Sequence, residues 1–120
     1  MFTTMADHVH VSRTSGLPEA SAHGWWMGRS GHAAKPGVRA VVAVWLQAKS
    51  THGGWKQVAK GRKAVLSGGG SGKRATARKA CRGAARTAWR SVIDVDVLGG
   101  ADSSRKLTTA AQNLSCGAGI

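Results

Sequence analysis

The residue types that perform most enzyme chemistry are sparse in this chain of 120 residues. Ser91, Ser103 and Ser104 carry hydroxyl groups that could act as nucleophiles, but no histidine is predicted beside them. Asp94 and Asp96 would lie about 7 Å apart on one face of a strand, a regular spacing that suits a solvated face better than an acid–base pair. We therefore expect no catalytic residues, no enzymatic activity and no cofactor.

Metal ligands are the second possibility, because Asp7 stands just before a His8-Val9-His10 pair. These three side chains could offer ligands from an extended chain. A lone His-x-His pair in a flexible segment is usually a chance occurrence, however, so we predict no metal site.

The two cysteines, Cys81 and Cys116, each stand at the end of a predicted strand. A zinc site is disfavoured because neither has a second cysteine or histidine at ligand spacing. The small size of the domain and the even number of cysteines favour a disulfide, which would stabilise the fold by about 4 kcal/mol. Two buried free thiols are the alternative.

Positive charge is concentrated in the middle of the chain. The formal net charge is +13, and residues 38–90 contain thirteen basic residues and no acidic one. Such a block attracts polyanions without sequence specificity, although it could also be a solvated surface with no ligand. The residues that we expect to bind anions are Lys60, Arg62, Lys63, Lys73, Arg74, Arg78 and Lys79.

Residues 68–74 read GGGSGKR and raise the question of a phosphate-binding loop. The nucleotide-binding pattern requires glycine, four residues, and then Gly-Lys-Ser/Thr. Here Ser67 stands where the first glycine belongs, and Arg74 replaces the hydroxyl residue that would bind magnesium. We therefore predict a turn, whose backbone N–H groups beside Lys73 and Arg74 could hold an anion loosely.

The elements that must position these residues are predicted to be strands. From Val38 to Leu46 apolar side chains alternate on one face, and the run around Ser91 to Val97 alternates even more cleanly. Gly53-Gly54 indicates a hairpin, and shorter strands are predicted at 62–67, 73–81 and 107–116. The predicted fold is an all-β, immunoglobulin-like sandwich of about six antiparallel strands. Its predicted core comprises Val42, Val44, Leu46, Trp55, Val65, Trp89, Ile93, Val95 and Val97.

A basic helix at residues 73–90 is the alternative, since arginines recur there at every fourth position and alanine is abundant. Like charges would repel along that stripe, Gly83 would weaken the helix, and the opposite face offers only alanine and Cys81. Strand is therefore favoured.

Residues 1–37 are predicted to be a disordered or loosely attached segment, which leaves residues 38–120 as the β-sandwich domain. The first segment holds four of the five histidines and both prolines, with no apolar periodicity apart from the Trp25-Trp26 pair. No stretch approaches the roughly 18 apolar residues of a membrane-spanning helix.

The segment from Leu46 to Cys81, the run TAWRSVIDVDV and the closing NLSC together resemble small secreted proteins of Streptomyces-type actinobacteria. The resemblance covers about residues 38–117. It implies an immunoglobulin-like β domain, a disulfide and export. The N-terminal residues show no signal peptide, so we expect a secreted or cell-surface protein if the gene start is misplaced, and otherwise a cytoplasmic one.

These observations predict a non-enzymatic β domain that binds anionic cell-wall polymers or lipid head groups through a basic face. The alternative is a cytosolic nucleic-acid-binding protein that uses residues 73–90 as a basic helix. Neither hypothesis predicts an oligomeric state.

Overall fold

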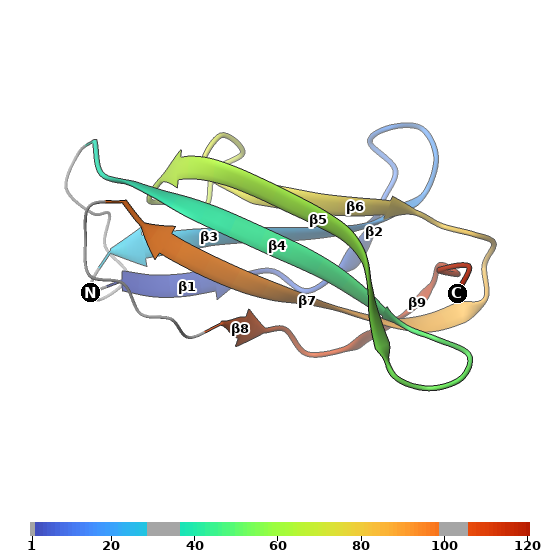
Figure 1. The fold of residues 1–120 in the computed structure, drawn as a ribbon. Coiled ribbons are helices and arrows are strands. Elements are labelled where there is room, and N and C mark those ends of the chain that lie inside the picture. The colour runs from blue at the N-terminus through green and yellow to red at the C-terminus, as the bar shows by residue number, and fades with distance from the viewer. Residues whose placement is uncertain (1, 29–36, 99–105) are drawn as a thin grey trace.

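The computed structural model describes residues 2–28, 37–98 and 106–120, and within these ranges all regular structure is β (Figure 1). The strands are β1 (Phe2–Ala6), β2 (His10–Ser12), β3 (Glu19–Gly28), β4 (Arg39–Lys49), β5 (Trp55–Leu66), β6 (Ala75–Ala80), β7 (Arg86–Val97), β8 (Leu107–Thr108) and β9 (Gln112–Ser115). The predicted all-β class is confirmed. A helix capable of crossing a membrane is not found among the described residues.

The strands form two antiparallel sheets that pack together in a sandwich-like arrangement (Figure 1). In the four-stranded sheet β3 is central, with β1 and β2 along one side and β6 along the other. The five-stranded sheet has the order β5-β4-β7, and both β8 and β9 pair with the far side of β7. β5 and β6 are therefore edge strands of different sheets.

The alternation predicted for the two longest runs is confirmed. On β4, Ala40, Val42, Val44 and Leu46 are fully buried between the sheets. On β7, the residues from Trp89 to Val95 alternate in the same way, and Trp89 and Ile93 are fully buried. Burial of β-branched side chains on one face of paired strands supplies the main favourable contribution to folding here.

Strand boundaries differ from the predicted ones in two places. The predicted hairpin strand and the short strand after it form one continuous twelve-residue strand, β5. The predicted closing strand is instead divided into β8 and β9. In the second case the chain leaves the ladder after Thr108, and Thr109 then bonds to Ser91 through its side chain.

The prediction of a disordered N-terminal segment is wrong for residues 2–28, which supply β1, β2 and β3. The domain therefore includes them; residues 29–36 lie outside the described residues. The pattern was missed because the inward positions of β3 are small, and alanine and glycine give weak apolar periodicity. Small residues are needed there: a Cβ on Gly24 would lie 2.8 Å from Ile93 Cγ2 on the opposite sheet.

The basic helix predicted as an alternative for residues 73–90 is also wrong. Residues 75–80 form β6, and β7 begins at Arg86. Between them Gly83 has a φ of 78°, a left-handed conformation that a right-handed helix does not contain. Paired strands bury Ala75 and Ala77 against the other sheet, whereas a helix would have had little apolar area to bury.

Trp55 was predicted to lie in the core, but it is only partly buried and lies on the outer face of the five-stranded sheet. A β-bulge causes this difference. Leu46 pairs with Ala59 while Gln47 pairs with Gln57, so Val58 is an extra residue in β5. One extra residue reverses the faces of all residues beyond it, and this places Trp55 outward beside Lys49.

Two tryptophans anchor opposite ends of the core. Trp26 of β3 donates its indole N–H to the carbonyl of Val65 in the opposite sheet, at 3.0 Å. Trp89 donates to the carbonyl of Cys116 at 2.9 Å. Cys81 and Cys116 form a disulfide, with Cα atoms 4.7 Å apart, which confirms the predicted pair. Because Cys81 follows β6 and Cys116 follows β9, this bond joins the two sheets.

Candidate functional site

The two edge strands β5 and β6 lie against each other along one side of the molecule (Figure 1). Their closest approach is at Gly61, where an added Cβ would overlap the carbonyl oxygen of Thr76. Glycine is therefore required for the two strands to come this close. This contact brings together basic residues that are separated in the sequence.

We call the predicted anion-binding residues the basic edge: Lys60, Arg62, Lys63, Lys73, Arg74, Arg78 and Lys79. The structure places three of them on β5, two on β6 and two in the loop before β6. Five are exposed, while Arg74 and Lys79 are half-buried. They do not share one sheet face. Strand register places Lys60 and Arg62 on the outside of one sheet and Arg78 on the outside of the other.

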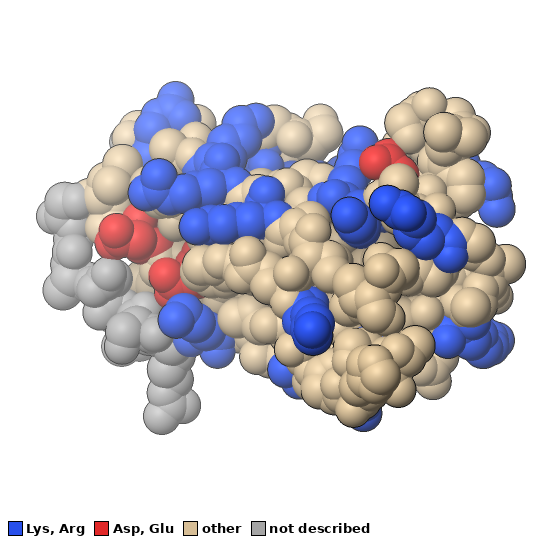
Figure 2. Space-filling model, turned by 45° about the vertical axis from the view of Figure 1, so that its right-hand side comes forward, with Lys and Arg blue, Asp and Glu red and all other residues tan. Residues whose placement is uncertain are grey.

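The basic edge contains no acidic residue, since β5, β6 and the loop between them have none. Figure 2 shows Lys and Arg side chains gathered along the upper part of the molecule, where β5 and β6 lie in Figure 1. Charges of one sign that are close together raise the local potential and attract counter-ions. The arrangement suits a ligand with several negative charges.

A hollow of about 430 Å³ lies at one end of the basic edge, beside the glycine-rich loop. We call it the glycine-loop hollow, and it is lined by Arg39, Leu66, Gly68, Gly69, Gly70, Gly72 and Lys73. Arg39, which sequence reasoning did not select, therefore joins Lys73 at this hollow. Backbone N–H groups of glycine loops can approach an anion closely because no side chain intervenes. Arg39 and Lys73 give the hollow two basic side chains that could attract an anionic group.

The outer face of the five-stranded sheet carries two tryptophans covered by cations. Lys60 and Lys106 lie over Trp45, with each Nζ within 6 Å of the ring centroid. The Arg90 guanidinium lies 4.2 Å from the centroid of Trp55, and its Nε donates to Gln47 Oε1 at 2.7 Å. These cation–π contacts fix the direction of the long basic side chains.

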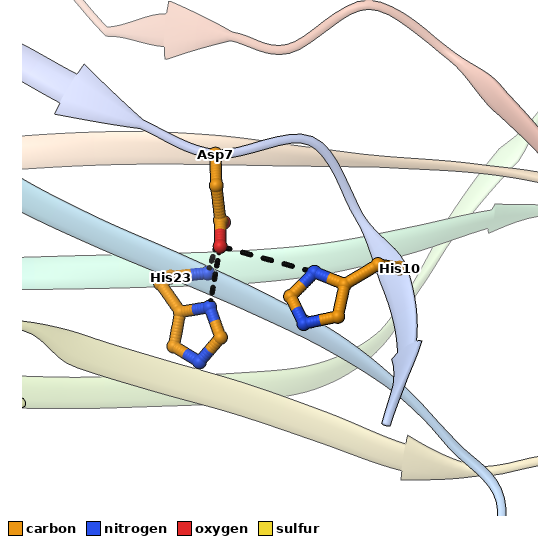
Figure 3. A group of neighbouring side chains, drawn as sticks. All are labelled: Asp7, His10 and His23. Carbon is orange, nitrogen blue, oxygen red and sulfur yellow. Dashed lines mark hydrogen bonds and ion pairs between the residues drawn. The ribbon is translucent and has the colours of Figure 1, made fainter. Parts of the chain in front are cut away.

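A third group lies on the outer face of the four-stranded sheet, where Asp7, His10 and His23 come together (Figure 3). Asp7 and His10 were considered as ligands from the sequence, whereas His23 was not. Its partner stands 16 positions earlier, and only the antiparallel pairing of β3 with β1 and β2 brings it close. His8 is outside this group, and its Nδ1 lies 3.4 Å from Gln112 Nε2.

Comparisons with protein-family models, with curated proteins and with solved structures find no match to this chain. Its function must therefore be inferred from the geometry of the described residues.

Proposed function

We propose that this protein is a non-enzymatic β domain that binds anionic polymers along the basic edge. The observation that carries the proposal is the close contact of β5 and β6 at Gly61 and Thr76, because it assembles seven basic residues with no acidic residue among them. Attraction to a polyanion requires this density of charge but no specific geometry.

A linear polymer fits this surface better than a membrane does. β5 has twelve residues, which corresponds to a length of about 40 Å. Where β5 and β6 meet, the two sheets form a seam, and cations point outward on both sides of it. A chain laid along the seam contacts cations on both sides, whereas a planar bilayer would contact only those facing one way. The glycine-loop hollow then receives one charged group of that chain.

The domain is proposed to be an exported, immunoglobulin-like module, as its resemblance to small secreted actinobacterial proteins implies. Two packed antiparallel sheets and a cross-sheet disulfide beside Trp89 support this proposal. Disulfides persist mainly in oxidising compartments, so the Cys81–Cys116 bond favours a location outside the cytosol. Anionic cell-wall polymer is the corresponding ligand class.

The test compares two triple variants of equal charge on a heparin column and in titrations with polyphosphate. Lys60→Glu, Arg62→Glu and Arg78→Glu change exposed residues of the basic edge, while Arg13→Glu, Arg82→Glu and Arg86→Glu change exposed residues outside β5 and β6. We expect the first variant to lose retention at low salt and the second to keep most of it, because binding depends on local charge density.

Equal losses in the two variants would show that only total net charge matters, and would refute the basic edge as the site. Vesicles with anionic lipid provide a second comparison. Stronger binding to vesicles than to the soluble polymers would replace the proposed polymer with a membrane surface.

A further inference from the structure

The Asp7, His10 and His23 side chains converge on one another from three separate segments. Asp7 lies in the connection after β1, His10 is in β2, and His23 is in the central strand β3 (Figure 3). Asp7 Oδ2 lies 2.7 Å from His23 Nδ1 and 3.8 Å from His10 Nδ1. One ligand atom from each residue lies within 4.8 Å of the other two.

These distances are close to those that a tetrahedral metal centre requires. With metal–ligand bonds of 2.0–2.1 Å, neighbouring ligand atoms of a tetrahedral zinc ion are about 3.3 Å apart. The two observed distances from Asp7 lie on either side of this value. The two imidazole nitrogens lie within 4.8 Å of each other, so side-chain rotations that move these atoms by up to about 1.5 Å bring all three onto one ion.

The group is anchored on its buried side and open on the other. The His23 side chain is 6% exposed, Asp7 is 31% exposed and His10 is 47% exposed. Asp7 Oδ1 also accepts a hydrogen bond from the backbone N–H of His23 at 3.0 Å, which fixes the carboxylate. The His10 and His23 rings are stacked, with centroids 5.4 Å apart. Two of the three groups are thus held in place before any ion arrives.

Ser21 provides a second, independent indication of a ligand on this face. Its hydroxyl is fully buried and has no hydrogen-bond partner, which is unusual among the described residues. Ser21 pairs directly with His10 and stands two positions before His23 on the same side of β3. A water molecule bound to an ion in this group would give that hydroxyl a partner.

We propose that Asp7, His10 and His23 form a binding site for a zinc-class divalent cation, with at least one coordination position left to solvent. Two imidazoles and one carboxylate suit zinc and its transition-metal neighbours, whereas magnesium prefers oxygen ligands alone. The His10 ring now donates from Nδ1 to the carbonyl of His8 at 3.1 Å. Binding of the ion releases this proton, and the proton shared by Asp7 and His23, to solvent.

Binding at this site links the connection between β1 and β2 to the centre of the four-stranded sheet. An ion that binds only the folded chain raises its stability by mass action. The experiment uses the full chain, freed of metal with a chelator, and measures zinc chloride binding by isothermal titration calorimetry together with thermal unfolding. We expect one zinc ion per chain and a rise in Tm, with no response to magnesium chloride.

His10→Ala is the main variant, because His10 is half-exposed and its removal leaves the core intact. His52→Ala is the matched control, since His52 is exposed in the turn between β4 and β5 of the other sheet. Changing an outer-shell partner of a metal ligand costs about 10–100-fold in affinity, so loss of a ligand itself should cost at least about 100-fold. His23→Ala and Asp7→Asn should give similar losses, whereas His52→Ala should bind like the original chain.

Cobalt chloride gives a spectroscopic readout, because a four-coordinate cobalt site with imidazole ligands absorbs visible light far more strongly than the hydrated ion. We expect these bands in the original chain and in His52→Ala, and their loss in His10→Ala. Absence of zinc binding to the original chain would overturn the proposal. So would equal affinities of the His10 and His52 variants, which would indicate adsorption to surface histidines.

Discussion

Asp7 shows most clearly how single residues gain their role from the fold. Burial raises the pKa of its carboxyl, but hydrogen bonds from the His23 side chain and backbone, together with the charges of His23 and His10, outweigh burial. Its pKa therefore lies below the ordinary value near 3.8. None of this is visible in the sequence, because a contact between residues 16 positions apart depends on the hairpin geometry.

The Asp7→Asn variant should make stability less dependent on pH. Because the folded-state pKa of Asp7 is lowered, its contribution is present above the unfolded-state pKa and is lost as pH falls through the folded-state pKa. Near neutral pH the variant should be less stable by about 1.5–3 kcal/mol, the contribution expected for hydrogen bonds to a charged group.

Urea unfolding at neutral and at strongly acidic pH measures this difference. The two proteins should converge in acid, where the original carboxyl is protonated. A difference that stays constant across the whole range would contradict the assigned role of the charge.

Among the strands, β5 shows both features that the sequence predicts correctly and features that it cannot predict. The burial of Val65 and the basic character of the strand could be deduced from residue types. The bulge at Val58 could not, because an extra residue leaves no mark on composition and yet reverses the faces beyond it. Trp55 was misplaced for that reason. The contact of Gly61 with β6 was equally hidden, since it depends on the partner sheet.

Replacing Gly61 with alanine should push β5 and β6 apart. An added Cβ overlaps the Thr76 carbonyl, which is backbone and cannot rotate away, so we expect a loss of about 1–3 kcal/mol, as for other overpacked sites. Gly70→Ala is the matched control, because nothing lies within 4 Å of its added Cβ and its φ is not in the left-handed region. Urea unfolding of both variants measures the effect; equal stabilities would mean that the two edges are not in close contact.

At the scale of the whole molecule, the sandwich-like class and the cysteine pair could be predicted, but three of the four strands of one sheet could not. The strands from β4 onward carry strong alternation, and cysteines in a small domain are informative by their number alone. β3 escaped because most of its inward residues are small, for example Ala20, Ala22 and Gly24, whereas β1 and β2, with five and three residues, are too short to show a clear period. Close packing between sheets selects such residues, and it makes the segment look like a loop in the sequence.

The disulfide also determines how this domain would respond to mechanical force. The two chain termini lie at opposite ends of the molecule (Figure 1), so tension applied to them passes from Cys81 straight to Cys116. The 35-position segment between the sulfurs carries no load, and β7, the strand at the heart of one sheet, lies within it. In single-molecule pulling, adding a reductant should lengthen the unfolded chain by about 120 Å. An unchanged contour length would show that the bond does not bear the tension.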